Sequence, residues 1–278
     1  MSNTFVIDKP DNFEINQIFD CGQCFRFNRH PHKENTYCGV AFSRFLEITQ
    51  KDSKLYLNTT KDEFDNIWRT FFDFDTDYKA VISSFCDDAT LKTASEFSYG
   101  IRILRQDPWE ALCSFIISQN NNIPRIKGII ENLSRQYGEK ILCDDGNVCY
   151  SFPTAKSLYD AGEEKIFALK TGFRAKYIYD CAKQVANGSL NLEKINSMSL
   201  EEALALLQTV KGVGPKVASC ALLFGFGKYD AFPVDVWVKK ILDKYYKDVT
   251  CKHFSSLHAG IAQQYLFYYE RCKNNVYL

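Results

Sequence analysis

Residues 199–226 constrain the fold more than any other segment, because their pattern predicts two helices joined by a glycine hairpin. Ser199 and Glu202 have the spacing of a capping box, which starts a helix. The apolar residues that follow keep helical spacing: Ala203, Leu206, Leu207 and Val210. The next five residues are Lys211-Gly212-Val213-Gly214-Pro215, where two glycines permit a tight turn and proline suits the start of a helix. The second helix buries a similar stripe: Val217, Cys220, Ala221 and Phe224. The sequence therefore predicts a helix-hairpin-helix.

The hairpin glycines Gly212 and Gly214 expose unpaired backbone N–H groups at the start of a helix. Such groups suit a phosphate of DNA. The alternative is an ordinary turn within a helical bundle, which the pattern alone leaves open.

Lys216 and Asp235 are candidates for the chemistry. Lys216 falls in the first turn of the second helix, where a cation is unfavourable, so the position favours the neutral amine that a nucleophilic lysine needs. Asp235 follows Phe232-Pro233-Val234 and has the pattern of an N-cap. The ordinary interpretations are that Lys216 is a solvated surface lysine and that Asp235 only caps a helix. If the two side chains lie close together, a catalytic role becomes more favourable for both.

The rest of the chain predicts an α+β fold. Residues 36–60 contain three short alternating runs rich in β-formers, separated by turn residues, which indicates an antiparallel meander. Residues 61–82 are acidic, aromatic-rich and helical in pattern, and we expect them to cover one face of this meander. From about residue 100 the period is 3.6 throughout, with Asp107-Pro108-Trp109-Glu110 predicted as another capping box. We expect an N-terminal antiparallel sheet domain with helices over residues 1–100 and an all-helical domain over residues 101–278.

Composition limits the function classes. The 278 residues are 46% hydrophobic and 24% charged, which excludes a disordered or fibrous protein. Net charge is zero, but residues 1–100 carry 11 basic and 16 acidic side chains against 23 and 18 in residues 101–278, so a polyanion would favour the second part. The start has no export signal and no apolar run is long enough for a membrane span, so we expect a cytoplasmic protein, nucleoid-associated if bacterial, with its 11 cysteines reduced.

Four separated motifs resemble the 8-oxoguanine DNA glycosylase/AP lyase family of the helix-hairpin-helix (HhH-GPD) DNA glycosylase superfamily. The longest stretch covers residues 213–220 together with Phe232-Pro233-Val234-Asp235-Val236. The others are Gly22-Gln23-Cys24-Phe25-Arg26, residues 118–125 (SQNNNIPR) and residues 172–177 (GFRAKY). The four motifs occur in the family's order over nearly the whole chain.

The resemblance implies a bifunctional DNA glycosylase/AP lyase that excises 8-oxoguanine during base excision repair after flipping it out of the duplex. Lys216 would attack the deoxyribose C1′ to give a Schiff base, and β-elimination would then nick the strand. Asp235 would stabilise positive charge on the sugar. For the damaged base, the resemblance implies that the Gly22 carbonyl reads N7–H, Cys220 and Phe267 sandwich the ring, and Gln263 bonds the Watson–Crick edge.

The same resemblance implies a monomer that binds double-stranded DNA, preferably with cytosine opposite the lesion. Phe173 would wedge beside the vacated site, and Asn120, Arg125 and Arg174 would donate to the abandoned cytosine. Phe173 stands where better-known family members have tyrosine, which predicts a weaker choice of opposite base. Trp237 stands where they have histidine, which predicts altered contacts to the DNA backbone or the pocket.

No cofactor is required by this chemistry. The family suggests a structural monovalent or divalent cation on the main-chain carbonyls of Gln208, Val210 and Val213. Cys251 and Cys272 are too few for an iron–sulfur cluster, and Cys21-x-x-Cys24 with His30 and His32 is only a superficial zinc pattern. The rival functions are a related glycosylase for another damaged base and a non-catalytic helix-hairpin-helix DNA-binding module.

Overall fold

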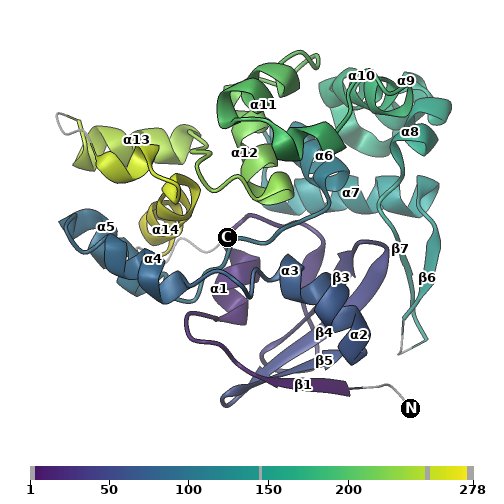
Figure 1. Cartoon of the computed structure of the whole chain (residues 1–278). Helices are drawn as coiled ribbons and strands as arrows, with labels where there is room; N and C mark the ends of the chain where they lie inside the picture. Colours follow the sequence, from purple (N-terminus) through teal and green to yellow (C-terminus); the bar gives the residue numbers. More distant parts are fainter. Residues whose placement is uncertain (1–3, 144–145, 248–250, 274–278) are drawn as a thin grey trace.

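An antiparallel sheet lies beside a larger helical region in the computed structural model, which describes residues 4–143, 146–247 and 251–273 (Figure 1). The five strands, in spatial order, are β1 (Thr4–Asp8), β5 (Lys54–Asn58), β4 (Arg44–Lys51), β3 (Thr36–Ala41) and β2 (Phe27–Arg29). The predicted meander is confirmed as β3, β4 and β5. The two edge strands were not predicted, because β2 is only three residues long and β1 packs against β5, far away in the chain.

One face of the sheet is covered by short helices. These are α1 (Ile15–Asp20), α2 (Lys61–Glu63), η1 (Phe64–Trp68) and α3 (Arg69–Phe71). Strand residues that alternate in the sequence, such as Leu46 and Ile48, are fully buried against Trp68 and Phe71, and these form a cluster that we call the sheet core. The prediction that helical residues 61–82 cover the sheet is confirmed for this part.

The helical region is built around a second cluster, the helical core. Its helices are α4 (Tyr78–Ser84), α5 (Ala89–Phe97), α6 (Pro108–Ser118), α7 (Ile123–Tyr137), α8 (Ala155–Ala161), α9 (Glu163–Ile166), α10 (Ala175–Ala186), α11 (Leu200–Leu207), α12 (Pro215–Phe226), α13 (Val236–Tyr245) and α14 (Ala259–Cys272). Four short helical turns connect them: η2 (Phe167–Thr171), η3 (Gly172–Arg174), η4 (Glu193–Ser197) and η5 (Lys252–Ser255). The prediction of an α+β protein with a helical second part is confirmed.

Two details of that prediction are wrong. The 3.6 period does not hold throughout, because β6 (Lys140–Leu142) and β7 (Val148–Tyr150) form a two-stranded hairpin after α7. The predicted boundary at residue 100 does not coincide with the division between the cores, since Tyr78, Phe85 and Leu91 of the first part are buried in the helical core.

Helix starts follow the predicted caps with one difference. Ser199 and Glu202 form the capping box of α11, each side chain bonding the other's backbone. Asp107 also caps α6 by accepting from the backbone N–H of Glu110 at 2.9 Å. The carboxyl of Glu110 does not complete a capping box; burial raises its pKa to about 7, opposed by the nearby charge of Arg26.

Candidate active site

Lys216 and Asp235 lie at the starts of two helices that face the same cavity. Lys216 is in the first turn of α12, and its Nζ is 3.5 Å from the Oγ of Ser118 and 5.4 Å from the ring centroid of Phe115. Asp235 is the N-cap of α13, with Oδ1 accepting from the backbone N–H of Val238 at 2.8 Å. The capping interpretation of Asp235 is therefore confirmed, and the second carboxylate oxygen is not needed for it.

The cavity gathers all six residues predicted for chemistry and damaged-base binding. It has a volume of about 60 Å³ and is lined by Gly22, Lys216, Cys220, Asp235, Gln263 and Phe267. These residues come from the loop after α1, from α12 and α14, and from the N-cap of α13, which are far apart in the sequence. The sequence interpretation missed four further lining residues: Phe115, Phe224, Pro233 and Gln264.

The cavity walls combine apolar surface with an unpaired amide. The Gln263 side chain is only 5% exposed, and its Oε1 has no hydrogen-bond partner. An unpaired buried acceptor is costly, so this atom is suited to a ligand that brings a donor. Burial raises the pKa of the Cys220 thiol, with a smaller opposing effect from Lys216, so Cys220 presents a neutral, polarisable surface.

A wider groove of about 690 Å³ opens beside the cavity. It runs between the end of α6 and the starts of α12 and α13, and Lys216 and Asp235 line both hollows. Gly214, Asn120 and Trp237 also line it. Two reactive side chains at the junction of a small pocket and a long groove suit a polymer that inserts one unit into the pocket.

The hairpin between α11 and α12 needs one of its two glycines for its conformation. Gly212 has φ +82°, and a Cβ there would lie 2.3 Å from the ring of Tyr177. Gly214 has φ −92° and acts as the N-cap of α12, with nothing within 4 Å of a Cβ. Gly212 thus permits the tight turn as predicted, whereas the backbone at Gly214, which is exposed on the groove, does not require glycine.

The proposed cation carbonyls lie in the same hairpin. Gln208 and Val210 follow α11, which ends at Leu207, so Val210 is buried beyond the helix and not within it as predicted. The Val210 carbonyl accepts from the Val213 N–H at 3.0 Å. A main-chain cation on Gln208, Val210 and Val213 stays a prediction. Among the described residues there is no group of three or more His, Cys, Asp or Glu side chains arranged for a metal.

The asparagine-rich turn is held by a buried arginine. Asn120 has φ +47°, a left-handed conformation that asparagine tolerates better than most residues. The guanidinium of Arg174 donates to the carbonyls of Gln119, Asn120 and Thr171, and its side chain is 2% exposed. In this structure Arg174 supports the turn, and most of its donors are in use.

Phe173 and Arg125 are accessible beside that turn. The Phe173 ring is 48% exposed and lies 4.4 Å from the Arg174 guanidinium carbon, so it is not a core residue. Arg125 is exposed in the first turn of α7, where Asn122 is the N-cap. Roles for Asn120, Arg125, Phe173 and Arg174 toward an opposite base stay predictions.

Trp237 belongs to a stack that joins the groove to the cavity. The Arg271 guanidinium carbon lies 5.5 Å from the Trp237 ring centroid and 5.1 Å from the Phe267 ring centroid. Its buried Nε has no hydrogen-bond partner. Sequence reasoning singled out Trp237 but gave no role to Arg271.

Cys21 and Cys24 do not form a pair. Cys21 is buried in the helical core and Cys24 in the sheet core, and burial raises the pKa of the two thiols to about 12 and about 11. Neutral thiols in separate cores are poor ligands for zinc and poor partners for redox exchange.

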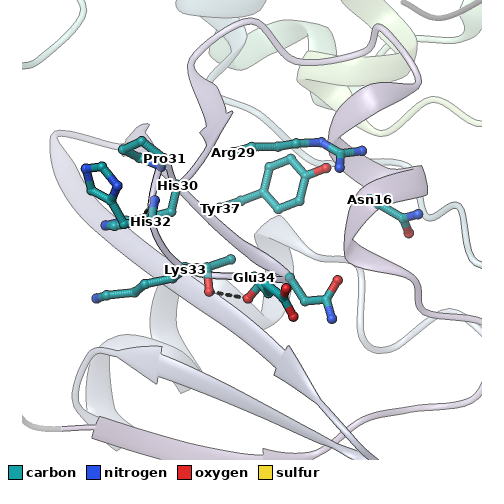
Figure 2. A pocket seen from close by; sticks show the side chains of 10 residues that line it. Asn16, Arg29, His30, Pro31, His32, Lys33, Glu34 and Tyr37 are labelled. Carbon is teal, nitrogen blue, oxygen red and sulfur yellow. Dashed lines mark hydrogen bonds between the residues drawn. The ribbon is translucent and has the colours of Figure 1, made fainter.

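A third hollow of about 470 Å³ lies at the β2–β3 edge, away from the predicted chemistry (Figure 2). Three of its side chains are already paired, Arg29 with Asp20 and both His30 and Lys33 with Glu47. This hollow contains none of the predicted site residues.

Comparisons with known proteins agree with this geometry. Residues 6–112 match the family described as 8-oxoguanine DNA glycosylase, N-terminal domain, and residues 113–252 match the HhH-GPD superfamily of base excision DNA repair proteins. The fold and site thus define a helix-hairpin-helix protein of base excision repair, and the chain belongs to the HhH-GPD superfamily. Its two matched domains, in this order, are those of the 8-oxoguanine DNA glycosylases.

Solved structures resemble the chain over its whole length. A Clostridium acetobutylicum 8-oxoguanine glycosylase/lyase, in complex with double-stranded DNA containing cytosine opposite 8-oxoguanine, is 41% identical with a TM-score of 0.89, over 99% of this chain and 100% of that one. MBOgg1, in complex with a low-affinity DNA ligand, is 40% identical with a TM-score of 0.92, over 99% and 98%. The N-glycosylase/DNA lyase of Saccharomyces cerevisiae is 40% identical over 53% of this chain, but the match spans only 42% of the yeast protein.

Proposed function

We propose that this chain is a bifunctional DNA glycosylase/AP lyase that removes 8-oxoguanine from double-stranded DNA. The observation that carries the proposal is the convergence of Gly22, Lys216, Cys220, Asp235, Gln263 and Phe267 on one cavity at the edge of a groove. A non-catalytic DNA-binding module has no need of a lysine and an aspartate at that junction.

The chemistry follows from the two reactive side chains. The Lys216 amine forms a bond to the sugar C1′ while the bond from C1′ to the base breaks, and the electron pair of that bond leaves with the base. The nitrogen then loses a proton and the C1′–O4′ bond breaks, with O4′ taking up a proton, which opens the sugar ring and gives the Schiff base. Removal of a C2′ proton then expels the 3′ phosphate and nicks the strand. Asp235 supplies negative charge beside the cationic sugar.

Recognition of the base uses both polar and apolar groups of the cavity. The unpaired Gln263 Oε1 accepts from the Watson–Crick edge of the purine, and Cys220 and Phe267 pack on its two faces. 8-Oxoguanine carries an N7–H where guanine has a lone pair, so the Gly22 carbonyl accepts a hydrogen bond from the lesion and repels the normal base.

The partner is DNA with cytosine preferred opposite the lesion, and the protein acts as a cytoplasmic monomer with no obligatory cofactor. Exposed Phe173 and Arg125 support a contact with the opposite strand. No helix in the described part of the chain has the length and apolar character to span a membrane. A structural cation at the hairpin stays part of the proposal.

The decisive test is borohydride trapping on duplexes that carry 8-oxoguanine or an alkylated purine opposite each of the four bases. The parent protein should trap and incise the 8-oxoguanine duplexes, best opposite cytosine. Lys216→Gln should abolish both, while Lys51→Gln, which removes an exposed lysine of the sheet that lines neither the cavity nor the groove, should keep both. Trapping that survives in Lys216→Gln would contradict the mechanism, and preferred excision of alkylated purines would favour the related glycosylase.

A further inference from the structure

Buried glutamines hold the loop that carries Gly22. Gln264 of α14 donates from Nε2 to the Cys21 carbonyl at 2.9 Å, and Gln106 donates from Nε2 to the Gln23 carbonyl at 2.8 Å. The two side chains are 3% and 8% exposed. The carbonyls on both sides of Gly22 are therefore fixed by amides that come from distant parts of the chain.

The Gln23 side chain anchors the loop from below. It is fully buried, donates to the carbonyls of Ile18 and Arg102 at 2.9 and 2.8 Å, and accepts from the Leu104 N–H at 2.9 Å. Losing one partner of such a bond leaves a buried polar group unsatisfied, so each bond resists displacement of the loop.

Gly22 is the part of this loop that reaches the cavity. Its φ of +80° turns the chain between the two fixed carbonyls, and a Cβ there would make only ordinary contacts, at 3.7 Å with Ile123 and 3.8 Å with Phe267. Gln264 lines the same cavity. Neighbouring residues of a helix point about 100° apart, so Gln263 and Gln264 have different surroundings. The Gln263 Oε1 has no hydrogen-bond partner at the cavity, whereas the Gln264 amide holds the loop.

We propose that Gln264 is a positioning residue for damaged-base selection, which it exerts by fixing the Gly22 carbonyl against the purine N7 edge. This inference rests on the proposed function. A fixed carbonyl distinguishes 8-oxoguanine from guanine in two ways. It accepts a hydrogen bond from the N7–H of 8-oxoguanine, and it cannot move away from the N7 lone pair of guanine, which it repels. A loop released from Gln264 would lose the first effect and relieve the second, so selectivity would fall.

The test measures selectivity apart from catalysis. In a Lys216→Gln background, equilibrium Kd values are measured by fluorescence anisotropy for matched duplexes with 8-oxoguanine or guanine opposite cytosine. Gln264→Leu removes the donor, and Gln264→Glu keeps the size but replaces the donating amide with an accepting carboxylate. Both should lower the guanine-to-lesion Kd ratio by about tenfold, the effect of one hydrogen bond, by raising Kd for the lesion duplex and leaving Kd for the guanine duplex unchanged or lower.

The control is Gln50→Leu. Gln50 accepts from the backbone N–H of Ile15 at 3.0 Å, so it holds the opposite end of α1 and does not line the cavity. Its ratio should match the parent, and thermal unfolding of every variant shows whether it is folded. Parent-like ratios in both Gln264 variants, or equal weakening toward both duplexes, would overturn the role of Gln264. A parent that does not distinguish the two duplexes would instead overturn the proposed substrate.

Discussion

Replacing Gly212 with alanine should destabilise the protein, whereas the same change at Gly214, two residues later, should be tolerated. At Gly212 the backbone is left-handed, with φ +82°, and the added methyl carbon would lie 2.3 to 2.5 Å from three ring atoms of Tyr177. At Gly214 the backbone has φ −92° and no heavy atom lies within 4 Å of the added carbon. The two substitutions therefore test one local geometry with the same chemical change.

The expected magnitudes differ several-fold. A left-handed conformation costs alanine roughly 1–2 kcal/mol, and overpacking against the ring costs roughly 1–3 kcal/mol more. Gly212→Ala should thus lower the free energy of unfolding by about 2–5 kcal/mol. Gly214→Ala should lower it by less than about 1 kcal/mol, because alanine is only a poorer N-cap than glycine.

Urea unfolding followed by tryptophan fluorescence measures both changes. A double-mutant cycle with Tyr177→Ala separates the two costs, since removing the ring relieves the overlap but not the backbone conformation. DNA affinity gives an independent readout for Gly214→Ala, which should bind the duplex more weakly although it is folded, because Gly214 faces the groove. If Gly212→Ala proved as stable as Gly214→Ala, the left-handed backbone and the close packing of Gly212 against Tyr177 would be refuted.

Three further outcomes are expected. Asp235→Asn should keep the hydrogen bond that caps the helix at Val238 and should keep DNA affinity, but single-turnover excision should slow by about a hundredfold or more because the negative charge is lost. Excision at the wild-type rate would show that Asp235 acts only as a helix cap. Arg174→Leu should lower the thermal unfolding midpoint strongly, and Arg174→Lys should lower it less, because lysine keeps the charge but lacks the planar fork that holds three carbonyls. Midpoints equal to that of the parent in both variants would argue that Arg174 does not support the turn. Glu110 binds a proton more tightly in the folded protein, with its pKa raised to about 7, so the stability that it contributes below pH 4.5 is lost as pH rises through 7. Glu110→Gln should therefore raise the urea midpoint at pH 8 and change it little at pH 5. An effect of the same size at both pH values would contradict the raised pKa.

The elements that the sequence predicted correctly are those fixed by local chemistry. The capping box at Ser199 and the proline start at Pro215 satisfy groups within one helical turn, so the spacing alone is informative. Gly212 also obeys a local rule. Gly214 has the same residue type but ordinary dihedral angles, and a single sequence does not separate a glycine needed by the turn from one that leaves space beside a groove.

The parts that were missed depend on contacts between distant residues. Gln264 meets Cys21 across 243 positions, and nothing near either residue in the sequence indicates the contact. Arg174 was assigned to DNA from its motif, but its guanidinium is used by carbonyls 54 and 55 residues away. Glu110 has the right spacing for a capping box, yet burial beside Arg26 decides its state. In each case tertiary packing selects one of several bonds that the local pattern permits.

Trp237 stands where the resemblance implies histidine, and its ring contacts an arginine of α14. Its ring lines the groove beside Asp235, and the Arg271 guanidinium lies between this ring and Phe267, a wall of the cavity. The indole of tryptophan offers a planar guanidinium a larger aromatic face than the imidazole of histidine does, so tryptophan at this position favours an arginine on α14. The buried Nε of Arg271 forms no hydrogen bond that would hold the group elsewhere. We therefore expect displacement of Trp237 by a strand in the groove to move Arg271 and, through it, the Phe267 wall of the cavity.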